Sequence, residues 1–222
     1  MLELVANALG ELNERMVFVG GCATGLLMTD SARPPVRATQ DVDVIAVVSS
    51  LANYYELEKE LRNAGFSQVA SDEPICRWTI RQIKLDVMPT DEKILGFSNR
   101  WYSEAVRTAN VYNLPNGRSI RLITAPYFVA TKIEAFHGRG EGDFLASHDI
   151  EDIVTLVDGR QELIDEVAHS EQSLQDYIAD EIEGFLGTPN FTDALPGHMA
   201  PDGGNQARIP AILQRLRTLA RI

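Results

Sequence analysis

Apolar and polar residues alternate through several short stretches in the first half of the chain, a pattern typical of β-strands. In residues 83–88, two charged residues alternate with apolar neighbours, so we expect one face of this segment in a core and the other outside it. Residues 75–80 precede this segment by only two positions. The two segments are therefore predicted to form a hairpin, although Arg81 and Gln82 are weak turn residues.

Helical spacing replaces this alternation after about residue 124. Residues 125–136 carry apolar side chains three and four positions apart, with a proline near the start, which favours a helix that has proline in its first turn. Similar spacing predicts helices over residues 147–157 and 209–222. The prolines and glycines of residues 184–207 indicate a long loop.

This change of pattern divides the chain into two regions. We expect an α+β protein, with a mixed sheet flanked by helices over residues 1–124 and an α-helical region over residues 125–222. With 222 residues and 45% hydrophobic content, the chain is long enough to bury a substantial core.

The strand predicted at residues 41–46 carries aspartates at two positions of one face. Asp41 and Asp43 point the same way because side chains alternate along a strand. Aspartate is depleted in strands and like charges side by side repel each other, so the pair indicates a site for a hard divalent cation. If the strand of Asp86 lies beside this one, three carboxylates converge. Any one of them alone is equally well explained as a solvated strand edge.

Mg²⁺ is the ion expected at such a site, as one ion or two, with Mn²⁺ as an alternative. Mg²⁺ usually completes its shell with water and substrate phosphates, so the carboxylates indicate a nucleoside triphosphate as much as a metal. Gly20 and Gly21 lie between a predicted strand and a predicted helix, where backbone is able to approach a phosphate closely. Alone, such a pair indicates only a tight turn.

Further polar residues surround these motifs. In chain order, the sequence carries Gly20-Gly21-x-Ala23, then Arg37-x-Thr39-x-Asp41-Val42-Asp43, and later Lys132 with Asp149 and Asp152. Together with Asp86, this order resembles the DNA polymerase β nucleotidyltransferase superfamily. The fuller pattern is similar to its AbiEii-like and MenT-like branch, whose members are often the toxin halves of toxin and antitoxin pairs.

The resemblance covers roughly the first two thirds of the chain, to about Arg160. The sequence departs from the family at two points. The spacing between the glycine pair and Asp41 is longer than in the minimal superfamily pattern, which fits the AbiEii-like branch better than the antibiotic-modifying branch. Gly21 stands where many members carry serine, so backbone rather than a hydroxyl would have to contact the phosphates.

The resemblance implies transfer of a nucleoside monophosphate from a nucleoside triphosphate to a hydroxyl acceptor, with release of pyrophosphate. It implies a nucleotidyltransferase-type mixed sheet in residues 1–124 and a helical region, residues 125–222, that completes the active site. The implied catalytic residues are Asp41, Asp43, Asp86, Lys132, Asp149 and Asp152, of which the first three bind metal. The implied nucleotide-binding residues are Gly20, Gly21, Arg37, Thr39 and Lys132.

Within this scheme, Asp41 and Asp43 hold the ion that carries the triphosphate, and Asp86 helps to bind a second ion. Lys132 contacts a phosphate, and Asp149 or Asp152 orders Lys132, Arg139 or the acceptor. The residues themselves leave simpler alternatives open. Lys132 at a surface would extend its amino group into water, Asp149 near a helix start would favour the helix dipole, and Arg37 would be a solvated loop residue.

Net charge and apolar runs limit the partners. A net charge of −12 argues against broad binding along nucleic acid, although arginines of the central region either line a local groove for an RNA end or pair with acidic groups of the same chain. No apolar run is long enough to span a bilayer and the N-terminus is acidic, so we expect a cytoplasmic protein with no membrane partner.

Three functions agree with these observations. The first is a toxin-like enzyme that modifies RNA, for example the acceptor end of transfer RNA, and that has an antitoxin protein as partner. The second is nucleotidyl transfer to a small molecule or to a protein hydroxyl. The third is a noncatalytic nucleotide-binding module on the same fold, against which the presence of Asp86 argues because binding alone needs only the first carboxylate pair.

Overall fold

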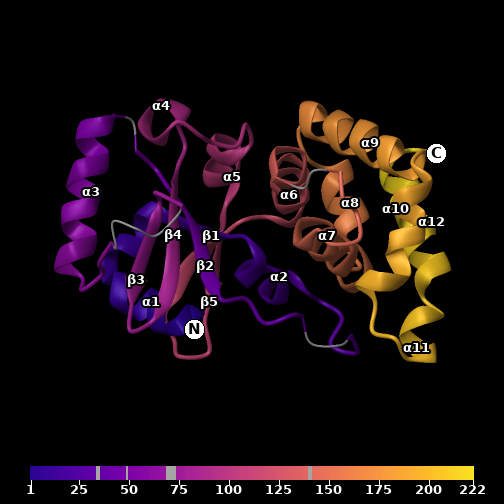
Figure 1. The fold of residues 1–222 in the computed structure, drawn as a ribbon, viewed down its shortest axis with the longest axis horizontal. Helices are drawn as coiled ribbons and strands as arrows, with labels where there is room; N and C mark the ends of the chain where they lie inside the picture. The colour runs from indigo at the N-terminus through magenta and orange to yellow at the C-terminus, as the bar shows by residue number, and fades with distance from the viewer. Residues whose placement is uncertain (34–35, 49, 69–73, 140–141) are drawn as a thin grey trace. The chain divides into compact units, whose positions relative to one another are not determined.

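The computed structural model describes residues 1–33, 36–48, 50–68, 74–139 and 142–222, and Figure 1 colours them by position in the chain. The chain divides into two compact units. The first unit comprises Met1–Ala23 and Arg37–Thr124, and the second comprises Thr24–Val36 and Ala125–Ile222. The chain therefore passes from one unit to the other three times, and each unit is described by itself below.

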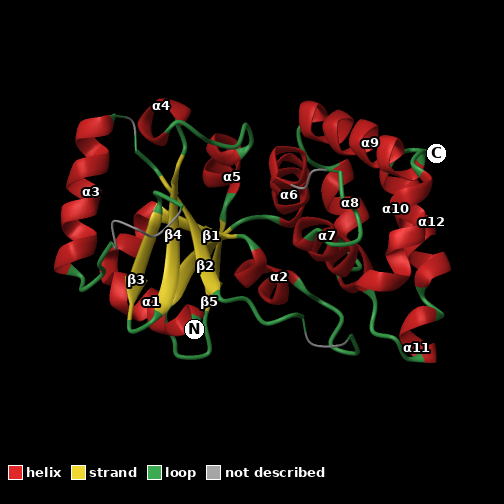
Figure 2. Cartoon of the chain, viewed as in Figure 1, coloured by secondary structure: helices red, strands yellow, loops and turns green. Residues whose placement is uncertain are grey.

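A six-stranded mixed sheet with the order β3-β4-β2-β1-β6-β5 forms the centre of the first unit. Figure 2 draws the strands in yellow. β2 pairs in parallel with β4 and antiparallel with β1, and β1 pairs in parallel with β6. This arrangement, with helices at the C-terminus, confirms the expected α+β fold class. The strands are β1 (Met16–Val19), β2 (Asp41–Ala46), β3 (Arg77–Ile80), β4 (Ile83–Pro89), β5 (Asn110–Asn113) and β6 (Ser119–Leu122).

One face of this sheet is packed with apolar side chains. Phe18 of β1 and Trp78 of β3 are both fully buried, and the guanidinium of Arg62 lies 5.3 Å from the centre of the Trp78 ring. Arg62 belongs to α3 (Leu51–Asn63), whose Tyr54 and Leu57 are buried as well. Because side chains alternate along a strand, this packing leaves the polar positions of β2, β3 and β4 on the other face.

The remaining helices of the first unit lie around the sheet. They are α1 (Leu2–Leu9), the 3-10 helix η1 (Gly10–Arg15), α4 (Glu92–Leu95), α5 (Tyr102–Thr108) and the start of α2 (Gly21–Leu27). Two side contacts attach α5 to the sheet. Arg121 of β6 donates a hydrogen bond to the carbonyl of Val106 at 2.6 Å, and the Tyr102 hydroxyl contacts the Met88 sulfur at 3.0 Å.

Both predicted hairpins are present. β3 and β4 are joined by Arg81 and Gln82, whose φ angles of +47° and +69° place both residues in the left-handed region. A two-residue turn that follows the right-handed twist of the strands demands this conformation, and residues other than glycine or asparagine adopt it with strain. In the second hairpin, between β5 and β6, Gly117 takes a φ of +81° at no such cost.

The second unit is helical. Its core includes four phenylalanines, Phe136, Phe144, Phe185 and Phe191, whose rings pack in pairs with centroids 4.9–5.6 Å apart. Across the described ranges, no helix is both long and apolar enough to cross a membrane. The helices are α6 (Ala125–Arg139), α7 (His148–Gly159), α8 (Leu163–Ala168), α9 (Gln172–Leu186), α10 (Pro189–Ala194), η2 (Leu195–His198), α11 (Gly203–Gln206) and α12 (Ile209–Leu219).

The prediction of a long loop at residues 184–207 was wrong, because α10, η2 and α11 occupy most of this segment. Pro189 stands in the first turn of α10, where the absent N–H costs no intrahelical hydrogen bond. Phe191 and Leu195 are each 1% exposed, so burial of their side chains stabilises helical turns that the prolines and glycines alone do not favour.

Residues 24–36 group with the second unit, whereas the sequence pattern had assigned them to the first region. The backbone N–H groups of Thr29 and Asp30 both donate hydrogen bonds to the carbonyl of Gly159, at 3.1 and 3.0 Å. Arg160 donates to the carbonyl of Leu27 at 2.6 Å. These bonds attach the segment after α2 to the end of α7, and the division between Thr124 and Ala125 is unaffected.

Candidate functional site

The pairing of β2 with β4 brings three carboxylates onto one face of the first unit's sheet. Asp43 is the direct strand partner of Asp86, and Asp41 lies two positions earlier on the same face. Val42 and Val44 point into the core on the other face and are fully buried, which fixes the direction of both aspartates. Asp86 is buried, while Asp41 and Asp43 are half-buried.

Arg77 of β3 lies against this cluster. It is the strand partner of Asp86, and its guanidinium holds that carboxylate through both oxygens, Nε to Oδ1 at 2.8 Å and Nη2 to Oδ2 at 2.7 Å. Nη2 also donates to Oδ2 of Asp41 at 3.3 Å. The hydrogen bond to Asp86 raises the pKa of Arg77, so this side chain is a permanent cation beside the carboxylates.

Arg77 belongs to none of the motifs in the sequence. It is one of the central arginines expected either to line a groove or to pair within the chain, and the structure shows the second for this residue. The signal that identifies it is the hairpin itself. A two-residue turn at Arg81 and Gln82 fixes the pairing of β3 with β4, and counting back from that turn places Arg77 opposite Asp86.

The glycine turn lies directly against the Asp43 carboxylate. Gly20 has a φ of +67°, and a Cβ atom added there would stand 1.9 Å from Oδ2 of Asp43. No side chain fits in that space, so glycine is required by both backbone conformation and contact. Gly21 follows as the first residue of α2, and the N–H of Ala23 bonds the carbonyl of Gly20 at 3.0 Å. The turn and the carboxylates therefore form one local site.

Three further residues adjoin the strands of this site in the sequence. Arg37 and Thr39, the other expected nucleotide-binding residues of the first unit, are half-buried in the coil that leads into β2. Cys76, which precedes β3, is 3% exposed. Burial, and secondarily the charge of Asp86, raise the pKa of its thiol to about 12, so the sulfur stays protonated at neutral pH and is a poor nucleophile.

The other expected catalytic residues form a cluster in the second unit. Lys132 of α6 is 6% exposed, and its Nζ lies 3.0 Å from Oδ1 of Asp149 and 2.6 Å from Oδ2 of Asp152 on α7. Arg139 donates to both oxygens of Asp149 at 2.9 and 2.8 Å, and Thr24 of α2 donates to Asp152 at 3.2 Å. Lys132 is thus buried and ion-paired rather than extended into water.

The pKa shifts in this cluster follow from its ion pairs. Burial lowers the pKa of Lys132, but the charges of Asp152 and Asp149 outweigh it and leave the pKa above its usual value. Burial likewise raises the pKa of Asp149, but hydrogen bonds from Arg139 and the charge of Lys132 outweigh it and leave the pKa below its usual value. Both groups are therefore charged at neutral pH.

The fit of a metal ion depends on the donor atoms and on Arg77. Among the residues that the structure describes, no three His, Cys, Asp or Glu side chains form a group ready to hold an ion as they stand. The donor set still suits a hard dication, because the carboxylates of Asp43 and Asp86 stand side by side on β2 and β4. The residues fit Mg²⁺ once Asp86 turns from Arg77.

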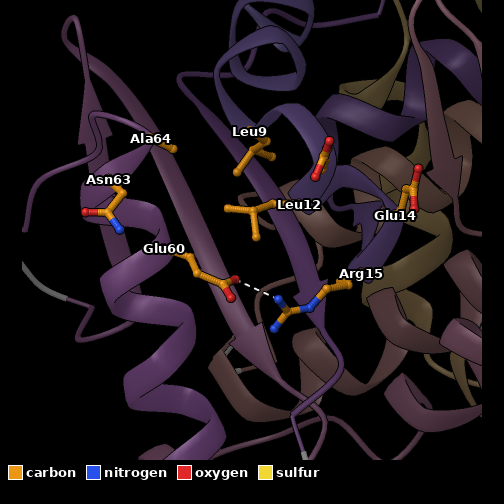
Figure 3. Close-up of a pocket in the computed structure, with 8 residues that line it drawn as sticks. Leu9, Leu12, Glu14, Arg15, Glu60, Asn63 and Ala64 are labelled. Atoms are coloured by element: carbon orange, nitrogen blue, oxygen red, sulfur yellow. Dashed lines mark hydrogen bonds and ion pairs between the residues drawn. The ribbon is translucent and has the colours of Figure 1, made fainter.

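A separate cleft of about 570 Å³ lies between η1 and α3 of the first unit (Figure 3). An ion pair between Arg15 and Glu60, 2.6 Å long, crosses its lining. This cleft shares no residue with the carboxylate site. Its lining consists of Leu9, Glu11, Leu12, Glu14, Arg15, Glu60, Asn63 and Ala64.

Neither a protein-family model nor a curated protein matches the sequence. The likeness to the polymerase β superfamily therefore rests on the motifs quoted from the sequence.

Proposed function

We propose that this chain is a metal-dependent nucleotidyltransferase that moves a nucleoside monophosphate from a nucleoside triphosphate to a hydroxyl acceptor and releases pyrophosphate. The observation that carries the proposal is the pairing of β2 with β4. It sets Asp43 against Asp86, with Asp41 on the same face, and the Gly20 turn packs directly against Asp43. Three carboxylates beside a glycine turn are the donors that a metal-bound triphosphate requires.

The three carboxylates divide the metal chemistry between them. Asp41 and Asp43 would hold the Mg²⁺ that accompanies the triphosphate, and Asp86 would hold a second ion on the acceptor side. When bound, these ions supply charge neutralisation to the transferring phosphoryl group. In-line displacement at phosphorus mainly requires that the protein position the reactants, so no covalent nucleophile is needed.

Backbone and basic groups bind the nucleotide in this proposal. Gly20 and Gly21 let the main chain approach the phosphates, and Arg37 and Thr39 contribute from the coil before β2. We assign Lys132 a phosphate contact by family resemblance. Its amino group has three donors and contacts two buried carboxylates, so a phosphate would use the third donor or replace one of the carboxylates. Asp149 and Asp152 then act as positioning residues that hold Lys132 until nucleotide binds.

The acceptor that we propose is an RNA end, such as that of transfer RNA, in a cytoplasmic toxin-like enzyme with an antitoxin partner. Family resemblance supports these finer assignments.

One observation favours a second candidate, a noncatalytic nucleotide-binding module. Because Arg77 already neutralises Asp86, the carboxylates are stable together without metal, as they would need to be in a fold that no longer carries out transfer.

Labelled nucleotides test the proposal. The purified protein is incubated with Mg²⁺ and each α-labelled nucleoside triphosphate, with and without total small RNA, and the label is followed. Label in RNA identifies an RNA nucleotidyltransferase and its base preference, and label in protein identifies modification of protein. A soluble labelled product that appears only on addition of a small-molecule mixture identifies a small acceptor. Absence of label in all three supports the noncatalytic module and contradicts the proposed activity.

A further inference from the structure

The two edges of the first unit's sheet differ. At one edge, β3 is covered by Ser67, whose N–H donates to the carbonyl of Thr79 at 2.9 Å and whose carbonyl accepts from the N–H of Thr79 at 2.8 Å. β5 lies at the other edge, and within the described residues no further strand pairs with its outer side. An open edge presents backbone groups that another extended chain is able to bind.

The ladder between β5 and β6 fixes which backbone groups face outward. The N–H of Leu114 donates to the carbonyl of Arg118 at 2.8 Å, so these two residues form a hydrogen-bonded pair. Bonded and non-bonded pairs alternate in an antiparallel ladder. Val111 and Asn113 therefore occupy non-bonded positions, and their N–H and C=O groups point away from β6. The outer side of β5 thus offers donors and acceptors at the spacing of a strand.

The composition of β5 does nothing to protect this edge. Its 4 residues, Asn-Val-Tyr-Asn, include no charge and no proline, two features that commonly prevent pairing at an edge. Val111 is 72% exposed, although valine is suited to sheets and its side chain gains from burial. A strand added here would pair with the outward backbone groups and cover Val111.

Basic residues flank this edge in an acidic chain. Residues 96–124 hold four arginines and one glutamate, whereas the chain as a whole has a net charge of −12. Because side chains alternate along a strand, Arg118 and Arg121 lie on opposite faces of the hairpin. Arg118 donates to the amide oxygen of Asn7 at 2.9 Å, and Arg121 donates to the carbonyl of Val106 at 2.6 Å. Within the described ranges, neither arginine lies in an ion pair.

These charges select the kind of strand that fits. Neighbouring strands lie about 4.8 Å apart, so a strand added to β5 would run about 10 Å from β6, close to the screening length of charges at physiological salt. An acidic segment would therefore be attracted on both faces. A second copy of β5 would bring its own arginines towards these two, so repulsion disfavours pairing between copies. RNA would match the arginines but not the outward backbone groups of Val111 and Asn113.

We propose that β5 is a docking strand for an acidic, extended segment of a partner protein, which adds to the edge of the sheet. The segment pairs with the outward groups of Val111 and Asn113 and covers the Val111 side chain. Its acidic side chains lie towards Arg118 and Arg121. The inference is independent of the proposed function, because it uses no residue of the carboxylate site.

Hydrogen exchange in the presence of defined probes tests the docking strand. One pool of short peptides contains valine and threonine with aspartate and glutamate, a second contains lysine and arginine in place of the acids, and a short single-stranded RNA is the third probe. Each is added to the ¹⁵N-labelled full chain, and exchange is followed amide by amide. The acidic pool should slow the exchange of Val111 and Asn113 by at least about tenfold, because a paired N–H is protected from solvent.

Three variants separate strand addition from simple attraction of charge. Val111→Pro removes an outward N–H but no ladder bond, so it should stay folded and lose the protection of Asn113. Arg118→Glu should weaken binding of the acidic pool by about tenfold and allow the basic pool to bind. Arg81→Glu makes the same charge change in the hairpin at the other edge and should leave binding unchanged.

A second form of the acidic pool keeps the test valid should Val111→Pro be unfolded. Methylation of the peptide nitrogens preserves the charges but prevents strand pairing, so this pool should not protect Val111 or Asn113 in the wild type. Protection by the unmethylated acidic pool and by no other probe supports the docking strand.

Other results overturn the inference. Binding of RNA or of both acidic pools without protection of Val111 and Asn113 would show a surface that only attracts charge. Protection that grows with protein concentration in the absence of peptide would show pairing between two copies. Failure of the acidic pool to protect these two amides would show that β5 does not accept an acidic strand.

Discussion

Each unit of the protein holds a cluster of charged side chains, and the two clusters differ in charge balance. In the second unit, Lys132 and Arg139 meet Asp149 and Asp152, so two cations face two anions that are almost completely buried. In the first unit, Arg77 and Lys84, the strand partner of Asp41, lie on the face of three carboxylates, two of them half-buried. Loss of one partner from a buried ion-paired cluster leaves an uncompensated buried charge and is strongly destabilising, whereas a more accessible carboxylate cluster is able to take a ligand.

The largest expected difference between the clusters is in activity. If the proposed function holds, Asp43→Asn removes a metal ligand and should reduce nucleotidyl transfer by about 100-fold or more, the usual range for loss of one group that stabilises transition-state charge. Transfer of α-labelled nucleotide measures this loss. Asp91→Asn, which keeps an oxygen to cap α4, is the matched control and should retain full activity. Full activity of Asp43→Asn would remove the metal assignment.

For stability we expect the reverse order: a substitution in the second unit's cluster should destabilise the protein more than one in the first unit's cluster. Asp152→Asn takes a charge from beside the buried amino group of Lys132 and should lower the free energy of unfolding by about 3 kcal/mol, the low end for breaking a buried ion pair, since Asp149 remains. Asp43→Asn relieves repulsion and should lower it little or not at all. Urea denaturation at neutral pH measures the free energy of unfolding of both variants and of the wild type.

The exposed Asp165→Asn serves as the control for the second unit and should change stability by less than about 0.5 kcal/mol. Equal losses for Asp152→Asn and Asp165→Asn would show that the Lys132 cluster does not stabilise the unit. A loss of about 3 kcal/mol for Asp43→Asn would show that the first cluster is balanced after all.

The balanced cluster should also set a pH dependence. The pKa of Asp149 is below its ordinary value of 3.8 in the folded protein, so its stabilising effect is present above that pH and is lost as pH falls through the native pKa. The pKa of Lys132 is above its ordinary value of 10.5, so its effect is present below that pH and is lost as pH rises through the native pKa.

Urea denaturation at a series of pH values measures this dependence. Asp149→Asn should lose less stability than the wild type between neutral pH and about pH 3, because it has no carboxylate to protonate at that position. Parallel curves for the two proteins would exclude Asp149 as a source of the acid sensitivity. Comparison with Asp165→Asn corrects for the general effect of removing one acidic group.

The smallest expected effect concerns the hairpin that carries the unbalanced cluster. Replacing Arg81 and Gln82 by Asn and Gly should stabilise the protein by about 1 kcal/mol, because both positions have positive φ angles. Thermal unfolding measures the change. Gly117→Ala in the other hairpin should have an effect of similar size and opposite sign, since its φ is +81° with open space around it. No gain would mean that the turn is not strained.

Local patterns were enough to predict much of the first unit. Alternation in residues 83–88 and the aspartates of residues 41–46 predicted two strands and the face on which the carboxylates lie, and both hairpins were confirmed. These features depend on the two-residue period of a strand, which is visible in the sequence as alternation of apolar and polar residues. Helix α6 followed in the same way from helical spacing and a proline in its first turn.

Features that depend on nonlocal contacts were not predicted. The attachment of residues 24–36 to the second unit uses mainly the carbonyls of Gly159 and Leu27, and a backbone acceptor leaves no pattern in the sequence. Helix α10 forms in a segment rich in proline because Phe191 is buried. The pairing of Arg77 with Asp86 is different, because the predicted two-residue turn already implied it and it was overlooked.

The attachment of residues 24–36 has a consequence for how such a protein is able to evolve. Because the first unit is interrupted by a segment that belongs to the second, neither unit is encoded by one continuous stretch of gene. Recombination at Thr124 would transfer the sheet together with a segment whose partners, the end of α7 and Arg160, had been left behind. The two units must therefore be inherited together, and variation is expected as substitutions within each unit rather than as exchange of whole modules.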